Sequence, residues 1–290
     1  MIYYDEPVIR PPAEADSLIL QATIGCSHNQ CTFCVTYKQK KFKIRNSDEI
    51  KKEIDWIARQ APGLRKVFLG DGDALAIPTD DLIRLLVYIR ERLPRVHKIA
   101  VYASPGNFES KTVPDLLRLK EHGLTLAYVG FESGDDDTLR NIRKGFTADE
   151  MATLMEKPNE AGLKLSATVI LGLAGPQHMQ RVSENTARLI DRVQPRFASA
   201  LTLMLPFGEK AYRRQWPDNW RMLKPEETLA ELRYLVNAVS SDRIIFRANH
   251  ASNYLAVEGT FQKGKQRMLA QIDAALNNLH SLRPEYLRGL

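Results

Sequence analysis

Three cysteines, Cys26, Cys31 and Cys34, are the only ones in the chain, and they follow one another in the spacing C-x4-C-x2-C. An odd, clustered set is not a disulfide framework. Neighbouring thiolates suit the ligation of a soft metal in a reducing compartment. A [4Fe–4S] cluster that only carries electrons takes four cysteines, so three leave one iron open. An open iron invites an external ligand, which indicates chemistry.

The alternative is a zinc knuckle in which His28 is the fourth ligand, because structural zinc takes four protein ligands. His28 follows Cys26 too closely for comfortable tetrahedral closure beside the other two cysteines. We therefore interpret His28 as a polar loop residue or as a donor to a ligand.

Composition narrows the class of protein. The chain has 290 residues, of which 44% are apolar and 26% are charged, and its net charge is +6. This length suits an α/β barrel, and it buries a core that needs no metal. The mild positive charge permits anionic partners without naming one. No run of about 18 apolar residues indicates a membrane span, and the start shows no signal peptide, so we expect a cytoplasmic protein.

Short apolar runs alternate with amphipathic segments along most of the chain. The runs that predict strands are 18–22, 66–69, 98–103, 125–131, 165–171 and 197–205, and the clearest predicted helices are 47–59, 79–92 and 178–193. Asn46 to Glu49 offers a capping box for the first helix. Most strand starts lie about 30 residues apart, the length of a strand plus a crossover helix, which predicts parallel strands; the first gap is longer because the cysteine loop is inserted there. Six such units favour an α/β fold of the open (β/α)6 partial TIM barrel type.

The pattern changes after Leu205. A polar, aromatic loop covers 206–224, followed by a predicted helix at 225–239, a strand-like run at 243–247 and a helix at 262–282. We expect an N-terminal lead-in at 1–17, a core barrel at 18–207 and an α-rich C-terminal extension at 208–290. The extension is expected to pack on the barrel and to contribute to the substrate site.

The cysteine loop directly follows the first predicted strand of this (β/α)6 chain. In this it resembles the radical S-adenosylmethionine (SAM) superfamily, most closely the branch of oxygen-independent coproporphyrinogen-oxidase-like and methylthiotransferase-like cores. The resemblance implies a [4Fe–4S] cluster on Cys26, Cys31 and Cys34, whose open iron chelates SAM. It also implies reductive cleavage of SAM to methionine and a 5′-deoxyadenosyl radical, which abstracts hydrogen from a substrate. The commonest spacing in the superfamily is C-x3-C-x2-C, so the extra residue here marks a subgroup.

The second predicted strand ends in Leu69-Gly70-Asp71-Gly72-Asp73. Glycines allow a ligand to approach the backbone closely, and a carboxylate accepts hydrogen bonds from an ammonium group. The segment resembles the Gly-Gly-Glu-type segment that holds the amino group of SAM in the superfamily. The resemblance therefore assigns Asp71, Gly72 and Asp73 to SAM binding, whereas an ordinary turn is the alternative.

The fourth unit contains Gly130-Phe-Glu132-Ser133-Gly134 and, further on, Lys144-Gly145. These resemble the Gly-x-Glu-Ser-Gly and Lys-Gly segments of the same branch, which implies that Glu132, Ser133 and Lys144 contact SAM. The alternatives are a solvated loop acid for Glu132 and a surface lysine for Lys144.

The fifth predicted strand contains Ser166 and ends at Leu171 and Gly172, where the family contacts adenine through backbone and apolar side chains. Leu171 is equally consistent with a core position. Ser104, after the third strand, is a further SAM-binding candidate, although together with Asn107 it also suits a turn.

Arg247 to Tyr254 is the densest polar stretch of the C-terminal part. Its hydrogen-bonding side chains suit substrate recognition, and His250 is then the candidate catalytic acid, base or donor. A helix-capping turn made by the same Asn and Ser residues explains the stretch equally well.

Five positive charges occupy 38–45, just past Cys34. Such a run is usually a solvated surface. It is also suited to contact with an RNA backbone, or to docking of an acidic flavodoxin or ferredoxin-type reductant near the cluster. We expect a radical SAM enzyme with an unidentified, small-molecule substrate and no membrane partner. The alternatives are a tRNA-modifying radical SAM enzyme and a non-catalytic zinc- or iron–sulfur-binding module that docks RNA.

Overall fold

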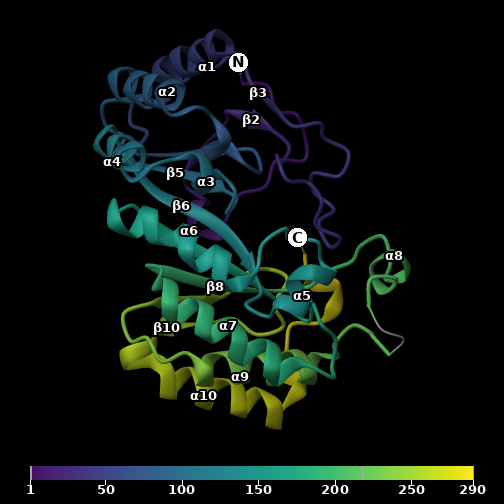
Figure 1. Cartoon of the computed structure of the whole chain (residues 1–290). Coiled ribbons are helices and arrows are strands. Elements are labelled where there is room, and N and C mark those ends of the chain that lie inside the picture. The colour runs from purple at the N-terminus through teal and green to yellow at the C-terminus, as the bar shows by residue number, and fades with distance from the viewer. Residues whose placement is uncertain (1, 217–218, 290) are drawn as a thin grey trace. The chain divides into compact units, whose positions relative to one another are not determined.

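The computed structural model describes residues 2–216 and 219–289. The chain divides into two compact units (Figure 1). Unit 1 comprises Met1–Asn29, Cys34–Val129 and Leu154–Leu165, and unit 2 comprises Gln30–Phe33, Gly130–Thr153 and Ser166–Leu290. The predicted division into lead-in, core and extension stays a prediction.

Unit 1 is built on parallel strands separated by helices. Its elements are β1 (Leu18–Gln21), β2 (Thr23–Ile24), β3 (Lys43–Ile44), α1 (Ser47–Gln60), β4 (Lys66–Gly70), α2 (Thr79–Arg92), β5 (Lys98–Ala103), α3 (Asn107–Ser110), α4 (Val113–Glu121) and most of β6 (Leu124–Glu132). The strand order is β1-β4-β5-β6, and each neighbouring pair is parallel. β2 and β3 form a separate antiparallel pair.

The helices of unit 1 follow from their apolar spacing. In α1, Ile50, Ile54 and Ile57 are buried at intervals of four and three residues, which places them on one face. Asn46 caps α1 by accepting a hydrogen bond from the backbone nitrogen of Asp48, so the cap is confirmed. The Glu49 side chain, which the predicted capping box would direct back to Asn46, lies 3.8 Å from Arg45 instead. Helices α1, α2 and α4 lie next to one another (Figure 1).

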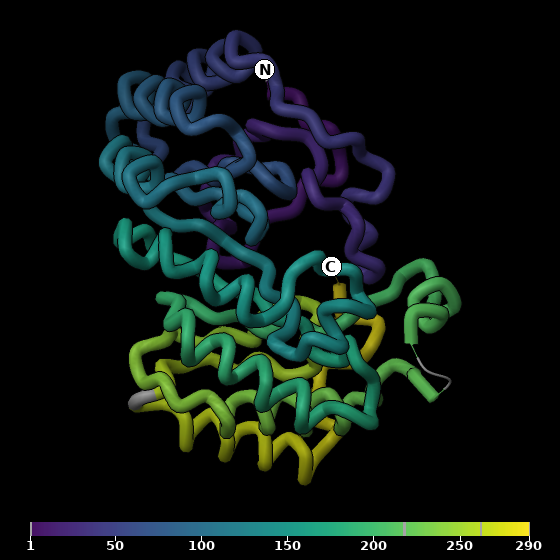
Figure 2. The backbone as a smooth tube through the Cα atoms, in the orientation of Figure 1, coloured from purple at the N-terminus to yellow at the C-terminus, as the bar shows by residue number. Residues whose placement is uncertain are grey.

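Unit 2 also alternates strands with helices, but its last two strands form an antiparallel pair. Its elements are α5 (Asp136–Asn141), the start of α6 (Ala148–Glu160), most of β7 (Lys164–Leu171), α7 (Met179–Val193), β8 (Phe197–Thr202), α8 (Lys210–Arg213), α9 (Pro225–Ala238), β9 (Ile245–Ala248), β10 (Val257–Thr260) and α10 (Phe261–Asn277). The order is β7-β8-β9-β10, in which only the β9–β10 pair, among the described residues, is antiparallel. Helices α7, α9 and α10 lie in a row (Figure 2).

The predicted α/β class with parallel strands is confirmed, and several predicted ends are corrected. The strand predicted for 197–205 ends at Thr202, before Pro206, which lacks a backbone donor. The helix predicted for 262–282 ends at Asn277, and a separate short turn of helix covers Leu279–Ser281. β10 was not predicted.

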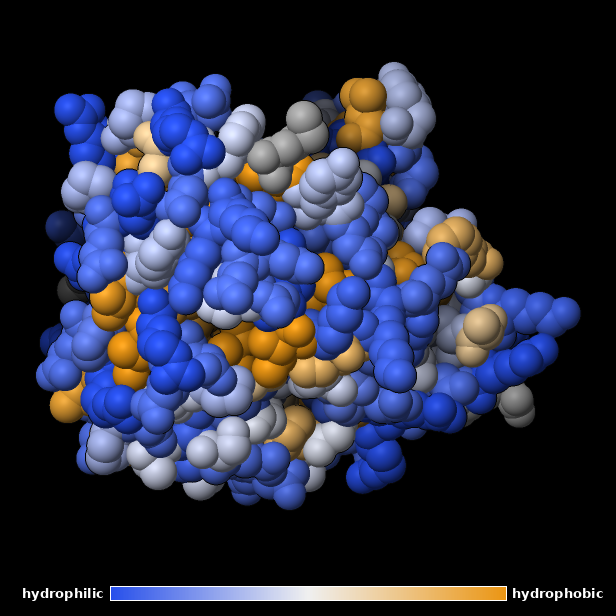
Figure 3. All heavy atoms as spheres, turned by 90° about the horizontal axis from the view of Figure 1, so that it is seen from above, coloured by the Kyte–Doolittle hydropathy of each residue, from blue (hydrophilic) through white to orange (hydrophobic). Residues whose placement is uncertain are grey.

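No helix within residues 2–216 and 219–289 is long and apolar enough to cross a membrane. Large exposed apolar side chains occur at scattered positions such as Tyr3, Phe207 and Tyr286. Hydrophilic side chains cover most of the face seen from above, with apolar groups showing between them (Figure 3).

Candidate functional site

The three cysteines lie on the long loop that connects β2 and β3. All three are free thiols and all are half-buried. Gly25, which precedes Cys26, has a φ of +72°, and a Cβ at this position would lie 3.2 Å from the Cβ of Lys40. The Nδ2 of Asn29 donates to the carbonyl oxygens of Tyr37 at 2.8 Å and of Lys40 at 3.3 Å. The first arm of the loop is therefore held against the returning arm.

The thiols fit the chemistry of an iron–sulfur cluster, because they form no disulfide, are partly accessible and are close together in sequence. Within the described part of the chain, no three His, Cys, Asp or Glu side chains form a ready-made metal site. The fit therefore rests on the donor set. His28 likewise belongs to no group of three potential metal ligands among these residues.

Asp71 follows β4 and is completely buried in unit 1. Its Oδ2 accepts hydrogen bonds from the backbone nitrogen of Gly25 at 3.1 Å and from the Nζ of Lys40 at 2.9 Å. Burial raises the pKa of the Asp71 carboxyl, and the hydrogen bond from Lys40 opposes that rise. A Cβ on Gly72 would collide with the ring of Tyr37, so only glycine fits there.

Asp73 is also completely buried and connects the cysteine loop to the end of β5. Its carboxylate accepts from the Ser27 hydroxyl, from the backbone nitrogen of Ser104 at 3.1 Å and from the Ser104 hydroxyl at 3.3 Å. Burial raises the pKa of the Asp73 carboxyl above its ordinary value. Asn107 also accepts from the nitrogen of Ser104, at 2.9 Å. The predicted residues Asp73 and Ser104 are therefore in direct contact.

In unit 2, the structure brings Glu132 and Lys144 together. Lys144 Nζ lies 3.0 Å from Glu132 Oε1, and the two side chains are 8% and 11% exposed. Glu132 has a φ of +65°, a strained value for a residue with a side chain. A Cβ on Gly130 would collide with the Glu132 carboxylate, so this glycine makes room for the folded-back side chain.

Ser133 is buried and shapes the turn after β6. Its hydroxyl accepts from the backbone nitrogen of Asp135 at 3.1 Å. The next residue, Gly134, donates its backbone N–H to Thr186 Oγ1 at 2.9 Å, and a Cβ here would lie 2.7 Å from the Cα of Thr186. The turn is thus seated directly on α7.

The end of β7 is held by groups that come from the C-terminal part of unit 2. Ser166 and Leu171 are buried within the strand. Gly172 donates its backbone N–H to Glu231 Oε2 at 2.7 Å. The carbonyl of Leu173 accepts from the Tyr212 hydroxyl and from Trp220 Nε1, each at 2.9 Å.

Glu231 was missed by the sequence analysis. It lies on α9 and is 2% exposed, and burial raises its pKa to about 8, opposed by the hydrogen bond from Gly172. The signal was present, because Glu231 shares the buried stripe of Thr228, Leu232 and Leu235. Because Glu231 has the helical spacing of these buried residues, its burial could have been predicted from the sequence.

His250 lies in a compact turn of unit 2. Its Nδ1 accepts from the backbone nitrogen of Ser252 at 3.1 Å and lies 2.9 Å from the Ser252 hydroxyl. Ser252 and Asn253 are buried, where they bond to Thr202 at the end of β8. Burial and the charge of Arg283 lower the pKa of His250. Ser252 and Asn253 therefore fasten the turn, and His250 is its half-exposed member.

A cavity of about 480 Å³ opens in unit 2 between the turn after β6, the start of α6 and α7. Its charged side chains pair with one another: Arg181 lies 3.2 Å from Asp135, and Arg192 lies 2.7 Å from Asp149. The lining carries four aspartates and three arginines, so its positive and negative charges nearly balance.

Comparison of the chain with known proteins identifies its family. The family model described as "Radical SAM superfamily" matches residues 20–183. The chain is 24% identical over 229 residues to a tRNA-2-methylthio-N(6)-dimethylallyladenosine synthase of Shouchella clausii, covering 76% of this chain and 42% of that protein. It is 27% identical over 142 residues to the heme chaperone HemW of Bacillus subtilis, covering 48% and 37%. The chain thus spans less than half the length of these relatives.

A solved structure with the same fold is the radical SAM methyltransferase TsrM of Kitasatospora setae, with cobalamin and a [4Fe–4S] cluster bound. Its TM-score is 0.59 at 16% identity, and the match covers 89% of this chain and 61% of that one. Radical SAM enzymes bind a [4Fe–4S] cluster and SAM, so both predicted cofactors are confirmed at the level of the family. The family match covers more than half of the residues, including all three cysteines, and the chain belongs to the radical SAM superfamily.

Proposed function

We propose that the chain is an enzyme that holds a [4Fe–4S] cluster through Cys26, Cys31 and Cys34. The observation that carries the proposal is the set of three partly exposed cysteines outside any disulfide, inside the region of the family match. When bound, the cluster and SAM supply a one-electron cleavage of SAM to methionine and a 5′-deoxyadenosyl radical, which abstracts hydrogen from the substrate.

The residues of this chain then bind SAM and shape its site. Gly72 is proposed to contact SAM through its backbone, while the buried Asp71 and Asp73 bond the end of β4 to the cysteine loop. In unit 2, Glu132 is the candidate for the ribose or ammonium group, and its ion pair with Lys144 fixes its orientation. The remaining residues proposed to contact SAM are Ser104, Ser133, Ser166, Leu171 and Gly172.

The electron requires an external reductant, for which we propose an acidic flavodoxin or ferredoxin-type protein. Lys38 and Lys41 on the returning arm of the cysteine loop and Lys43 at the start of β3 are exposed. Exposed cations near a redox centre speed the encounter with an acidic partner, and added salt weakens that effect.

We propose a small molecule as the substrate and His250 as the residue that contacts it, because His250 is the half-exposed member of a rigid turn. RNA is the second candidate, favoured by the similarity to a tRNA-modifying synthase and by the same exposed lysines.

Anaerobic reconstitution tests the proposal. The expected result is about four irons and four sulfides per chain, with formation of 5′-deoxyadenosine that requires both SAM and a reductant. Bound zinc without cleavage of SAM would instead support a non-catalytic metal-binding module. If product forms when tRNA is added but not when an RNA-free extract is added, RNA is the substrate and the second candidate is correct.

A further inference from the structure

Lys40 differs from every other lysine in the charged run after Cys34. Its side chain is 5% exposed, whereas Lys38, Lys41 and Lys43 are exposed. Lysine rarely buries its ammonium group, because the loss of hydration must be offset by an opposite charge and by full hydrogen bonding. The run is therefore not one uniform surface, and Lys40 has a separate task.

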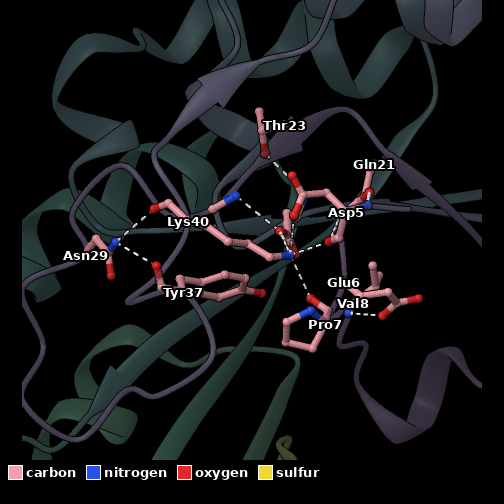
Figure 4. A network of polar contacts seen from close by, with 11 residues as sticks. Asp5, Glu6, Pro7, Val8, Gln21, Thr23, Asn29, Tyr37 and Lys40 are labelled. Atoms are coloured by element: carbon pink, nitrogen blue, oxygen red, sulfur yellow. Dashed lines mark hydrogen bonds and ion pairs between the residues drawn. The ribbon is translucent and has the colours of Figure 1, made fainter. Parts of the chain in front are cut away.

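The ammonium of Lys40 is fully bonded inside unit 1 (Figure 4). Its Nζ lies 2.9 Å from Asp71 Oδ2 and donates to the carbonyl oxygens of Pro7, at 2.8 Å, and of Asp5. An ammonium group has three donors, and here each finds an acceptor. Three segments that lie far apart in the sequence thus meet at one nitrogen.

The acceptor Asp71 extends this contact to the start of the cysteine loop. The same Oδ2 accepts from the backbone nitrogen of Gly25, which immediately precedes Cys26. Lys40 comes after Cys34, so the Lys40–Asp71 pair fastens both arms of the loop to the end of β4. The carbonyl of Lys40 also accepts from Asn29 within the loop.

The lead-in segment is fastened by the same group. Gln21 of β1 binds the backbone of Asp5 on both sides, accepting from its nitrogen at 2.9 Å and donating to its carbonyl at 3.0 Å (Figure 4). That carbonyl is the one that also accepts from Lys40. Gln21 and Lys40 therefore hold Asp5 and Pro7 against the returning arm of the loop.

We propose that Lys40 is a positioning residue that holds the cysteine loop and the lead-in segment on buried Asp71, so that the thiols are presented for the cluster. The proposal rests on the proposed function for its purpose, but it concerns the loop itself. A buried ion pair is weak support for global stability. The location of this pair, on both arms of the cysteine loop, accounts for its presence better.

The test uses the metal-free full-length chain and the rate at which its three thiols are alkylated. In Lys40→Met we expect alkylation to be faster by roughly tenfold or more, because the variant removes three hydrogen bonds of a buried ammonium group and the loss of even one of them favours opening of the loop. Lys41→Met removes an exposed neighbouring charge and is the matched control, whose thiols should be alkylated at the rate of the unmodified protein. After reconstitution, Lys40→Met should contain less iron per chain and give a weaker electron paramagnetic resonance signal.

A second variant separates positioning from charge balance. Lys40→Met alone leaves the Asp71 carboxylate unpaired, so it is accompanied by Lys40→Met/Asp71→Asn, which removes both charges. If Lys40 positions the loop, the double variant also shows fast alkylation, because the bonds to Asp5 and Pro7 are still missing. Thiol protection and iron content restored to normal in the double variant would overturn the proposal. So would normal values in Lys40→Met.

The two proposals fail in different ways. If the unmodified protein binds zinc and does not cleave SAM, the proposed function is wrong, yet the alkylation rates still decide the role of Lys40. If the unmodified protein assembles its cluster and Lys40→Met matches it in both measurements, only the positioning role is wrong.

Discussion

The carboxyl group of Glu231 accepts a hydrogen bond from the backbone nitrogen of Gly172 at 2.7 Å, which joins α9 to the end of β7. Glu231 is buried, and its pKa is raised to about 8 by that burial. A residue of the C-terminal part thus supports a strand end proposed to contact SAM, and it does so as a protonated acid at neutral pH.

This pKa predicts a pH dependence of stability. In the unfolded chain a glutamate titrates near 4.5, so between pH 4.5 and about 8 the folded protein binds more protons than the unfolded chain. The contribution of Glu231 is therefore full below pH 4.5 and is lost as the pH rises to about 8. Urea unfolding at a series of pH values should show this decline in the unmodified protein and a flatter profile in Glu231→Gln. Parallel profiles would contradict the prediction.

Each of the variants Cys26→Ala, Cys31→Ala and Cys34→Ala should lose the cluster while remaining folded. All three thiolates are proposed iron ligands, and the core is made of apolar side chains that need no metal. Iron analysis and circular dichroism are the measurements. If all three variants unfold, the metal has a structural role instead.

Glu132→Ala should weaken SAM binding and cleavage while the visible absorbance of the cluster persists. Glu132 is held by Lys144 at 3.0 Å in a strained conformation, as expected for a residue that orients a ligand. Asp149→Ala, which removes an exposed acid of unit 2, is the control. Equal SAM affinity in the unmodified protein and Glu132→Ala, measured by equilibrium binding, would remove Glu132 from the site.

His250→Ala should leave the slow, unproductive cleavage of SAM intact and suppress turnover of the true substrate. A lost hydrogen bond to a buried polar group of the substrate costs about 1–3 kcal/mol, which corresponds to roughly tenfold to a hundredfold. Asn249→Ala, at the exposed neighbour, is the comparison. A fall in melting temperature with unchanged turnover per folded molecule would mean that the turn only fastens β8.

Gly134→Ala should destabilise the protein by about 1–3 kcal/mol, because the added Cβ would lie 2.7 Å from the Cα of Thr186 on α7. Gly63→Ala is the matched control, since its nearest neighbour would be the Arg95 side chain at 3.9 Å. Denaturant titrations of both variants give the comparison. Equal denaturation midpoints in the two variants would show that the turn after β6 accommodates the added Cβ without loss of stability.

The sequence predicts the parts of this molecule that depend on local pattern. β5 and α2 have the predicted ends, because continuous apolar runs and 3.6-residue periodicity mark a buried strand and an amphipathic helix. The two-residue strands β2 and β3 are too short to show a period. Lys40 could not be recognised as buried, because its burial depends on Asp71, 31 residues further along the chain.

At the margin of unit 2, the short strand β10 has one side without a strand partner. Arg267 and Gln271 of α10 donate to the carbonyl oxygens of Glu258 and Ala256, at 3.0 Å and 2.8 Å. Ala256 directly precedes β10 and Glu258 lies within it, and carbonyls two residues apart in an extended chain point to the same side. Because side chains of α10 already bond to these carbonyls, they are less available to a strand of another chain that would extend the sheet by edge-to-edge pairing.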